Sequence, residues 1–219
     1  HNHSPLLSSP LLSHSPARDT CRYPEKFVNA TSFFAMGMRP NASTGYEGRT
    51  HRFYTGSTVF KFGDGLSYSA WTHTNAATAS ASVSSTLSID LAAAKAQLEA
   101  TRNAPHTATA LTTVQIDVRN DGPLRGDHVV LAFLSAPLGV AGVDGAPLQS
   151  LATYSRLGDV AVNATRRVEF AITAHHIANA LGAVRDAASG EMKLEIRKGA
   201  YVLRVGSGAE ALRLELVVR

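Results

Sequence analysis

The sequence predicts an all-β protein: an antiparallel sandwich preceded by an extended strap rich in glycine and aromatic residues. From Leu111 onward, apolar side chains recur at every second position in short runs separated by turn residues, which is the period of a strand. Before that, residues 38–71 interleave five glycines with seven aromatic side chains and show no period. Glycine permits positive φ and each ring buries a large area, so we expect this strap to lie across a surface that its rings contact.

The period-two runs define the strands. Val114, Ile116 and Val118 share one face, and residues 120–123 (Asn-Asp-Gly-Pro) form a turn. Residues 128–134 are apolar on both faces, which predicts a central, covered strand. After a loop over 139–147, the remaining strands are expected at 148–157, 168–172, 192–196, 201–205 and 212–216, with one helical turn at 175–181.

Short strands with turn residues between them are typical of sandwiches of the immunoglobulin or fibronectin type III kind. Tyr201 enters a late strand directly after a glycine turn, where such folds place a corner tyrosine. The Cys–Trp–Cys signature of immunoglobulin domains is missing, because Cys21 is the single cysteine of the chain.

Composition divides the chain into three parts. Residues 1–21 are rich in Ser, Pro and His and are expected to be disordered. Residues 22–71 hold the strap, and residues 72–219 hold the sandwich, interrupted by an Ala/Ser-rich insertion at about 76–110. Within the insertion, residues 91–100 favour a surface helix that Asp90 would cap.

Charge and sequence motifs limit the possible partners. The net charge is +4 with no run of Lys or Arg, so nucleic acid is not an expected partner, and no apolar run is long enough to span a membrane. Asn29, Asn41 and Asn163 each begin a glycosylation acceptor sequence, which indicates a secretory protein. The chain opens on His1, and we expect it to be part of a longer product.

No catalytic or metal-binding constellation is evident. A glycosidase needs two carboxylates about 5 to 9 Å apart. Glu47 and Asp64 lie among the strap's rings, but a solvated glutamate and a turn-forming aspartate are the simpler interpretation. Ser67 lacks the G-x-S-x-G setting of a hydrolase nucleophile, and the adjacent His175 and His176 lack the spacing of a zinc site.

Polar groups in the strap could still contact a carbohydrate hydroxyl or a protein. These candidates are Arg49, Arg52, Tyr54, Asp64 and Trp71. Their other possible role is to tie the strap to the surface on which it lies.

Several motifs resemble one enzyme family. FGDGLSY at 62–68 and GYEGRTHRFYTG at 45–56 resemble the tail of glycoside hydrolase family 3 enzymes, closest to the β-xylosidase/α-L-arabinofuranosidase branch. YPEKF at 23–27 is similar to the step that follows the family's catalytic α/β sandwich domain. Residues 118–122 and 199–206 match the V-x-N-x-G and G-x-Y-x-L-x-V-G patterns of its C-terminal fibronectin type III-like domain.

The resemblance implies a secreted or vacuolar retaining glycosidase that needs no cofactor and acts on xylan- or arabinoxylan-derived oligosaccharides. Its Asp nucleophile and Glu acid/base would lie upstream of residue 22, so no catalytic residue is assigned in this chain, which alone is expected to be inactive. Asp64 departs from the pattern, since the family commonly has an aromatic residue or His there. Xylose, arabinose and glucose all remain possible as the sugar released.

The alternative is a stand-alone, non-catalytic module that binds carbohydrate or protein. The enzyme hypothesis makes the missing catalytic domain the strap's platform, so several of four rings (Phe53, Tyr54, Phe60 and Phe62) should be under-packed in this chain. Full burial of all four would instead assign the strap to the sandwich.

Overall fold

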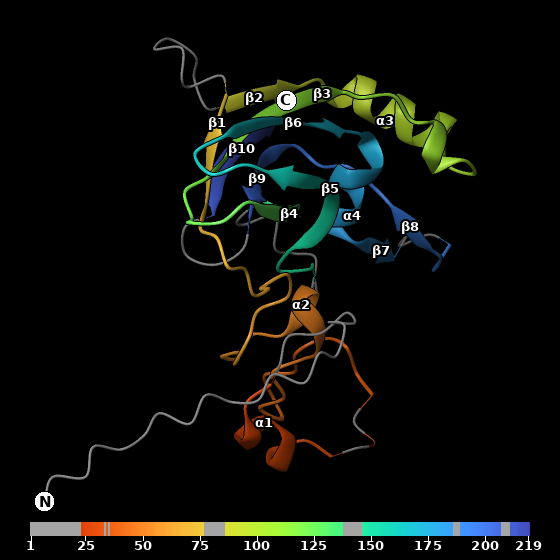
Figure 1. Cartoon of the computed structure of the whole chain (residues 1–219). Coiled ribbons are helices and arrows are strands. Elements are labelled where there is room, and N and C mark those ends of the chain that lie inside the picture. Colours follow the sequence, from red (N-terminus) through yellow and green to blue (C-terminus); the bar gives the residue numbers. More distant parts are fainter. Residues whose placement is uncertain are drawn as a thin grey trace, which may run out of the picture.

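The computed structural model describes residues 23–32, 34, 36–76, 86–137, 146–185, 189–206 and 211–219. Two sheets lie in the upper part of Figure 1 with helices at one side, and a smaller lobe lies below them. The helices are α1 (Glu25–Ala30), α2 (Thr50–Phe53), α3 (Leu91–Ala100) and α4 (Ala174–Leu181), with a 3-10 turn at Pro105–Thr107. The predicted disordered segment 1–21, with Cys21, and most of the predicted loop 139–147 lie outside the described residues.

Two packed sheets form the sandwich, which confirms the predicted fold class. The first has the order β1-β3-β6, with strands Trp71–Asn75, Thr112–Asn120 and Thr165–Ile172. The second has the order β2-β10-β9-β4-β5, with strands Thr86–Ile89, Leu212–Val218, Gly199–Val205, Gly126–Ser135 and Ser150–Val160. Only β2 and β10 of these pairs run parallel. A separate small sheet pairs β7 (Ala183–Arg185) with β8 (Met192–Leu194).

The core between the sheets follows the predicted alternation. On β3, Val114, Ile116 and Val118 are buried while Gln115 is exposed. Each such side chain removed from water stabilises the fold by roughly 1.5–3 kcal/mol, and the alternation places all of them on one face. The other strands contribute in the same way: Val168, Phe170 and Ile172 from β6, Tyr201, Leu203 and Val205 from β9, and Leu214, Leu216 and Val218 from β10.

Strand β4 is covered on both faces, as its sequence predicts. It lies between β9 and β5 in the larger sheet. Val130, Ala132 and Leu134 point into the core, whereas Phe133 is fully buried on the opposite face. Something outside the sandwich must therefore cover Phe133.

Residues 86–100 are joined to the sandwich although their composition suggests an insertion. β2 pairs with β10 from Thr86 to Ile89, and Leu91 N donates to Arg219 O at 2.9 Å. Asp90 caps α3 as predicted, because its Oδ1 accepts from Ala93 N at 2.7 Å. The helix buries one face through Ala94 and Leu98.

Two segments differ from the sandwich strands around them. Residues 25–30 form a helix: Pro24 sets the entry with φ −69°, Glu25 lies in the first turn, and buried Phe27 anchors the helix. The strand predicted at 192–196 forms only over Met192–Leu194, and Met192 and Leu194 are 54% and 37% exposed because β8 pairs only with β7 outside the sandwich. None of the helices in the described part of the chain could cross a membrane.

Tyr201 makes the contact predicted for a corner tyrosine. Its ring is fully buried, and its hydroxyl donates to Arg197 O at 3.0 Å, four residues upstream. Burial raises the pKa of Tyr201 above its ordinary value, so the hydroxyl stays protonated and keeps this bond.

We expect Tyr201→Phe to lower the free energy of unfolding by about 1–2 kcal/mol, because it removes one buried hydrogen bond and leaves a carbonyl without its donor. Urea titration measures the change. Tyr154→Phe is the matched control, since Tyr154 is 67% exposed, and it should change stability by less than about 0.5 kcal/mol. Equal effects of the two substitutions would contradict a structural role for the Tyr201 hydroxyl.

Candidate functional site

The two N-terminal motif segments pack against each other in an aromatic lobe, which we define as Tyr23, Phe27, Tyr46 and Tyr54. Tyr23 stacks on Phe27 with ring centroids 4.6 Å apart, and Tyr54 meets both rings edge-on at 4.8 and 5.0 Å. The Tyr23 hydroxyl also accepts from Thr50 N at 2.6 Å. The motif segments 23–27 and 45–56 are separated in the sequence, yet they form one hydrophobic unit around α1 and α2.

Glycine is required where the lobe turns. Gly48 has φ +82°, and a Cβ there would lie 2.8 Å from Phe53 O. Next to it, Arg49 Nε donates to the Tyr46 hydroxyl at 3.0 Å, and Arg49 N donates to Met38 O at 2.9 Å. Arg49 thus ties the strap's own turns together.

The next part of the strap lies on the outer face of β4 and covers Phe133. His51 stacks on Phe62 with centroids 4.1 Å apart, and Phe62 meets Phe133 edge-on at 5.9 Å. Gly63 has φ +85°, and a Cβ there would lie only 2.4 Å from Leu131 Cδ1. The strap therefore approaches the sheet more closely than any side chain at residue 63 would allow.

Two arginines, Arg52 and Arg204, lie at the contact between the strap and the sandwich. Arg52 O accepts from Leu148 N at 2.7 Å, and Arg52 Nη2 donates to Asn179 O at 3.4 Å. Arg204 lies 5.1 Å from the Phe133 ring centre and donates to Gln149. Burial lowers the pKa of both guanidinium groups, because removing a cation from water disfavours its charged form.

The strap's rings divide into packed and exposed ones. Phe53 and Tyr54 are buried, whereas Phe60 is 42% and Tyr68 is 91% exposed. Of the four rings predicted to test the strap, two are buried, Phe62 is half-buried and Phe60 is exposed, so the burial of all four that would assign the strap to the sandwich is not found. The sandwich is one platform of the strap, but it does not cover the whole strap.

The residues predicted to contact a partner do not converge on one site. Arg49 and Tyr54 belong to the aromatic lobe, Arg52 and Asp64 lie at the strap–sandwich contact, and Trp71 begins β1. Asp64 Oδ2 accepts from Lys61 N at 3.1 Å and so closes its own turn. Each of these side chains has an intramolecular role, and carbohydrate contact by any of them stays a prediction.

An open depression of about 640 Å³ lies between α1 and the strap. It is lined in part by Lys26, Phe27, Arg39, Tyr46 and Glu47. Glu47 is the one carboxylate of this described lining, and its Oε2 lies 3.2 Å from the Tyr54 hydroxyl. A retaining glycosidase needs two carboxyl groups about 5–5.5 Å apart, so this depression can bind a group but lacks the pair for hydrolysis.

The three predicted glycosylation sites are exposed to solvent. Asn29, Asn41 and Asn163 are all solvent-exposed, and Asn41 Oδ1 accepts from Ser43 N at 3.0 Å. Glycosylation stays a prediction at all three. Over the part of the chain that the structure describes, no group of three or more His, Cys, Asp or Glu residues could hold a metal ion.

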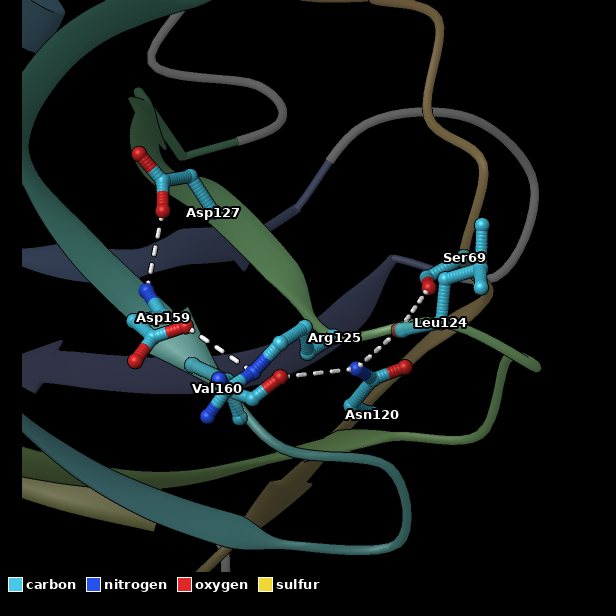
Figure 2. A network of polar contacts seen from close by, with 7 residues as sticks. All are labelled: Ser69, Asn120, Leu124, Arg125, Asp127, Asp159 and Val160. Carbon is cyan, nitrogen blue, oxygen red and sulfur yellow. Dashed lines mark hydrogen bonds and ion pairs between the residues drawn. The ribbon is translucent and has the colours of Figure 1, made fainter.

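Asn120 is the buried polar centre of the sandwich's end (Figure 2). Its Nδ2 donates to Leu124 O at 2.8 Å and Val160 O at 3.0 Å, while its Oδ1 accepts from Gly122 N at 3.0 Å. Ser69 Oγ donates to the same Leu124 carbonyl, which joins the end of the strap to this turn. The asparagine of the V-x-N-x-G pattern therefore holds three chain segments together.

The surrounding network extends to the exposed β5 edge. Arg125 Nε lies 3.1 Å from Asp159 Oδ1, and Asp159 N donates to Asp127 Oδ1 at 2.9 Å. The hydrogen bond from Arg156 lowers the pKa of Asp127, so this carboxylate is ionised at neutral pH. These exposed contacts add little stability individually, so the buried Asn120 dominates the network.

We expect Asn120→Ala to destabilise the protein by about 2–4 kcal/mol, because it leaves Val160 O and Gly122 N buried without partners. Thermal or urea unfolding measures the loss. Asn103→Ala, at an exposed turn position, is the control and should stay within about 0.5 kcal/mol of the parent. Similar stabilities for both variants would show that the network is dispensable.

Sequence reasoning identified Asn120 only as a turn residue and did not identify His51, His73, His128 or Arg204. The V-x-N-x-G pattern was the signal available for Asn120. The histidine contacts join residues far apart in the chain, and no local pattern reports them.

Several known proteins are similar to this chain in sequence and fold. No protein-family profile matches the chain. It is 32% identical over 136 residues to β-xylosidase/α-L-arabinofuranosidase 2 of Medicago sativa subsp. varia, an alignment that covers 62% of this chain and 17% of that protein. It is 29% identical over 195 residues to β-xylosidase/α-L-arabinofuranosidase 1 of the same plant, covering 89% of this chain and 24% of that protein.

The fold recurs in a solved family 3 (GH3) exo-β-xylosidase, XlnD, in complex with a xylobiose aziridine activity-based probe. The TM-score is 0.66 at 20% identity, over 91% of this chain and 24% of that chain. The strap and sandwich thus share the fold of part of that enzyme. The chain is similar to β-xylosidases and α-L-arabinofuranosidases of plants and has the fold of part of a family 3 enzyme, which confirms the resemblance given by the motifs. It spans only 17% and 24% of the length of the two Medicago relatives.

Proposed function

We propose that this chain is the C-terminal, non-catalytic part of a β-xylosidase-type retaining glycosidase, and that its strap supports the catalytic domains. The complete enzyme would release terminal xylose or arabinose from xylan- or arabinoxylan-derived oligosaccharides. Residues 22–71 would form the tail of the catalytic α/β sandwich domain with its connecting strap, and residues 72–219 a fibronectin type III-like domain. The names of the similar proteins and the chain's small share of their length support this proposal.

The observation that carries the proposal is the uneven packing of the strap. Phe62 is seated on the sandwich, whereas Leu66 and Tyr68 in the same FGDGLSY motif are 75% and 91% exposed. Val59 and Phe60 are also exposed. Clustered exposed apolar side chains mark interaction sites, and covering each of these would contribute roughly 1.5–3 kcal/mol.

The proposal assigns this chain a structural role in catalysis. Within the described residues, the depression beside α1 offers one carboxylate, Glu47, and none of the rings is arranged around a carboxylate pair. The nucleophile and the acid/base would come from domains upstream of residue 22. Secretion or vacuolar targeting is part of the same proposal, supported by the three exposed acceptor sequences at Asn29, Asn41 and Asn163.

The first test compares the product of the complete locus with the 219-residue chain. We expect the longer product to hydrolyse an aryl β-xyloside and the 219-residue chain to have no activity. Absence of activity in the longer product would overturn the enzymatic assignment. Activity in the isolated chain would overturn the placement of the catalytic groups.

The second test addresses the strap. We expect Leu66→Ser with Tyr68→Ser to lower the free energy of unfolding of the longer product by roughly 3–6 kcal/mol through lost burial, and with it the Tm and the aryl β-xylosidase activity, while leaving the Tm of the 219-residue chain unchanged. Tyr154→Ser is the matched control, since Tyr154 is an exposed ring on β5 away from the strap. An equal loss in both proteins would show that these side chains stabilise only the sandwich.

A second candidate function is a stand-alone carbohydrate-binding module. The depression that exposes Tyr46, Arg39 and Lys26 beside buried Phe27 favours it, because rings and cations suit sugar faces and hydroxyls. Calorimetry with xylo-oligosaccharides should then give heat that Tyr46→Ala abolishes. No heat from any of these oligosaccharides would remove this candidate.

A further inference from the structure

Trp71, His73 and His128, which we call the histidine clamp, join the two sheets where the strap enters the sandwich. Trp71 and His73 lie on β1 of the smaller sheet, and His128 lies on β4 of the larger one. The Trp71 indole stacks on the His128 ring with centroids 4.5 Å apart at an interplanar angle of 10°. His73 Nε2 lies 3.0 Å from His128 Nε2. The clamp therefore bridges sheets whose strands β1 and β4 do not pair.

A hydrogen bond between two imidazole Nε2 atoms needs one nitrogen that carries a proton and donates, and one that offers its lone pair. If the donating ring becomes cationic, it still donates and the bond persists. If both rings become cationic, neither Nε2 can accept, and the two rings face each other as like charges. The closed clamp therefore needs at least one neutral imidazole.

The rings are confined on several sides. Both histidines are half-buried, and a Cβ on Gly206 would lie 3.2 Å from the His73 ring. Trp71 covers His128, and its Nε1 donates to Ser67 Oγ at 3.1 Å, so the indole is itself fixed by the strap. Burial lowers the pKa of His73, and burial together with the neighbouring His73 lowers the pKa of His128 to about 4.

Most of the carboxylates around the clamp are paired with arginines. On the elements packed around it they are Asp127 on β4, Arg156 and Asp159 on β5, Asp117 and Arg119 on β3, Asp121 and Arg125 in the turn between β3 and β4, Arg204 on β9, and Arg213 and Glu215 on β10. Four carboxylates bind arginines, in the pairs Asp127–Arg156, Asp159–Arg125, Asp117–Arg167 and Asp121–Arg119. The pKa of His128 is lowered by burial and by the neighbouring His73, and none of these carboxylates sets the direction of that shift.

We propose that the histidine clamp is an acid-opened latch that holds the strap's exit and β1 against β4 at neutral pH and releases them when both imidazoles are protonated. β1 is suited to this release because it is an edge strand that pairs only with β3. The preceding residues Leu66 and Tyr68 are exposed and do not hold the strap to the sandwich, so the remaining contacts on this side are the hydrogen bonds of Ser69 and Ala70 and the pairing of β1 with β3. The released segment would be the same one whose rings project from the sandwich.

The direction of the pH dependence follows from proton binding. An exposed histidine titrates near pH 6.5, and His128 in the closed clamp titrates near 4. Between these values the open form binds more protons than the closed form, so acid favours opening. The clamp's contribution is complete above about pH 6.5 and is lost as the pH falls toward 4.

The test is hydrogen exchange of the 219-residue chain at pH 7.5 and 4.5, corrected for the intrinsic pH dependence of exchange. We expect the protection of the β1 amides at residues 71–75 to fall about tenfold or more at pH 4.5 in the parent. In His128→Gln, which keeps a polar side chain but cannot titrate, it should change less than about twofold. His106→Gln, at an exposed site away from the clamp, is the matched control and should behave like the parent. Equal protection at both pH values in the parent, or an equal fall in His128→Gln, would overturn the proposal.

A second measurement needs no variant and remains decisive if His128→Gln does not fold. Trp71 is the single tryptophan of the chain, so its fluorescence reports the clamp directly. We expect an emission change with a midpoint between pH 4 and 6.5, before global unfolding is seen by circular dichroism. A fluorescence change that coincides with global unfolding, or none at all, would show that the clamp is not an independent latch.

Discussion

The outer face of β4 is the constraint on which the path of the strap depends. Phe133 points away from the core of the sandwich, yet it is fully buried because Phe62 and His51 lie over it. A large ring left in water on this face would cost roughly 1.5–3 kcal/mol, so the strap and the sheet stabilise each other. Gly63 makes the close approach possible, since any side chain there would collide with Leu131. The strap is therefore a structural layer of the protein over part of its length.

Polar contacts then fix where the strap ends. Ser69 donates to the Leu124 carbonyl that Asn120 also binds, and Asp121 N donates to Ala70 O at 2.9 Å. The buried asparagine and the histidine clamp thus act within a few residues of each other, at the junction of the two sheets. The asparagine bonds persist at any pH because the amide does not titrate, whereas the clamp needs at least one neutral imidazole as an acceptor. One junction therefore combines a permanent anchor with a contact that acid can break.

The same arrangement explains how a chain without a carboxylate pair in its described depression could contribute to hydrolysis of a glycoside. Catalysis needs reacting groups held within about half an ångström of their productive positions, and distant supporting elements provide part of that order. A strap seated on the sandwich by Phe62, while Tyr68 remains exposed, has one face available for a neighbouring domain. In the proposed function, the sandwich is the rigid body that positions this face.

Local sequence patterns were sufficient to predict the family resemblance, the sandwich and most of its core. Period-two runs predicted the buried faces of β3, β6, β9 and β10, Asp90 predicted the start of α3, and the FGDGLSY motif carried the family resemblance, because these signals depend on neighbouring residues alone. The three-dimensional structure was needed to show which strap rings are buried, that Met192 and Leu194 lie outside the core, and that His73 meets His128. Those outcomes depend on contacts between distant segments, 55 residues apart for the histidines, and no local pattern encodes such pairings.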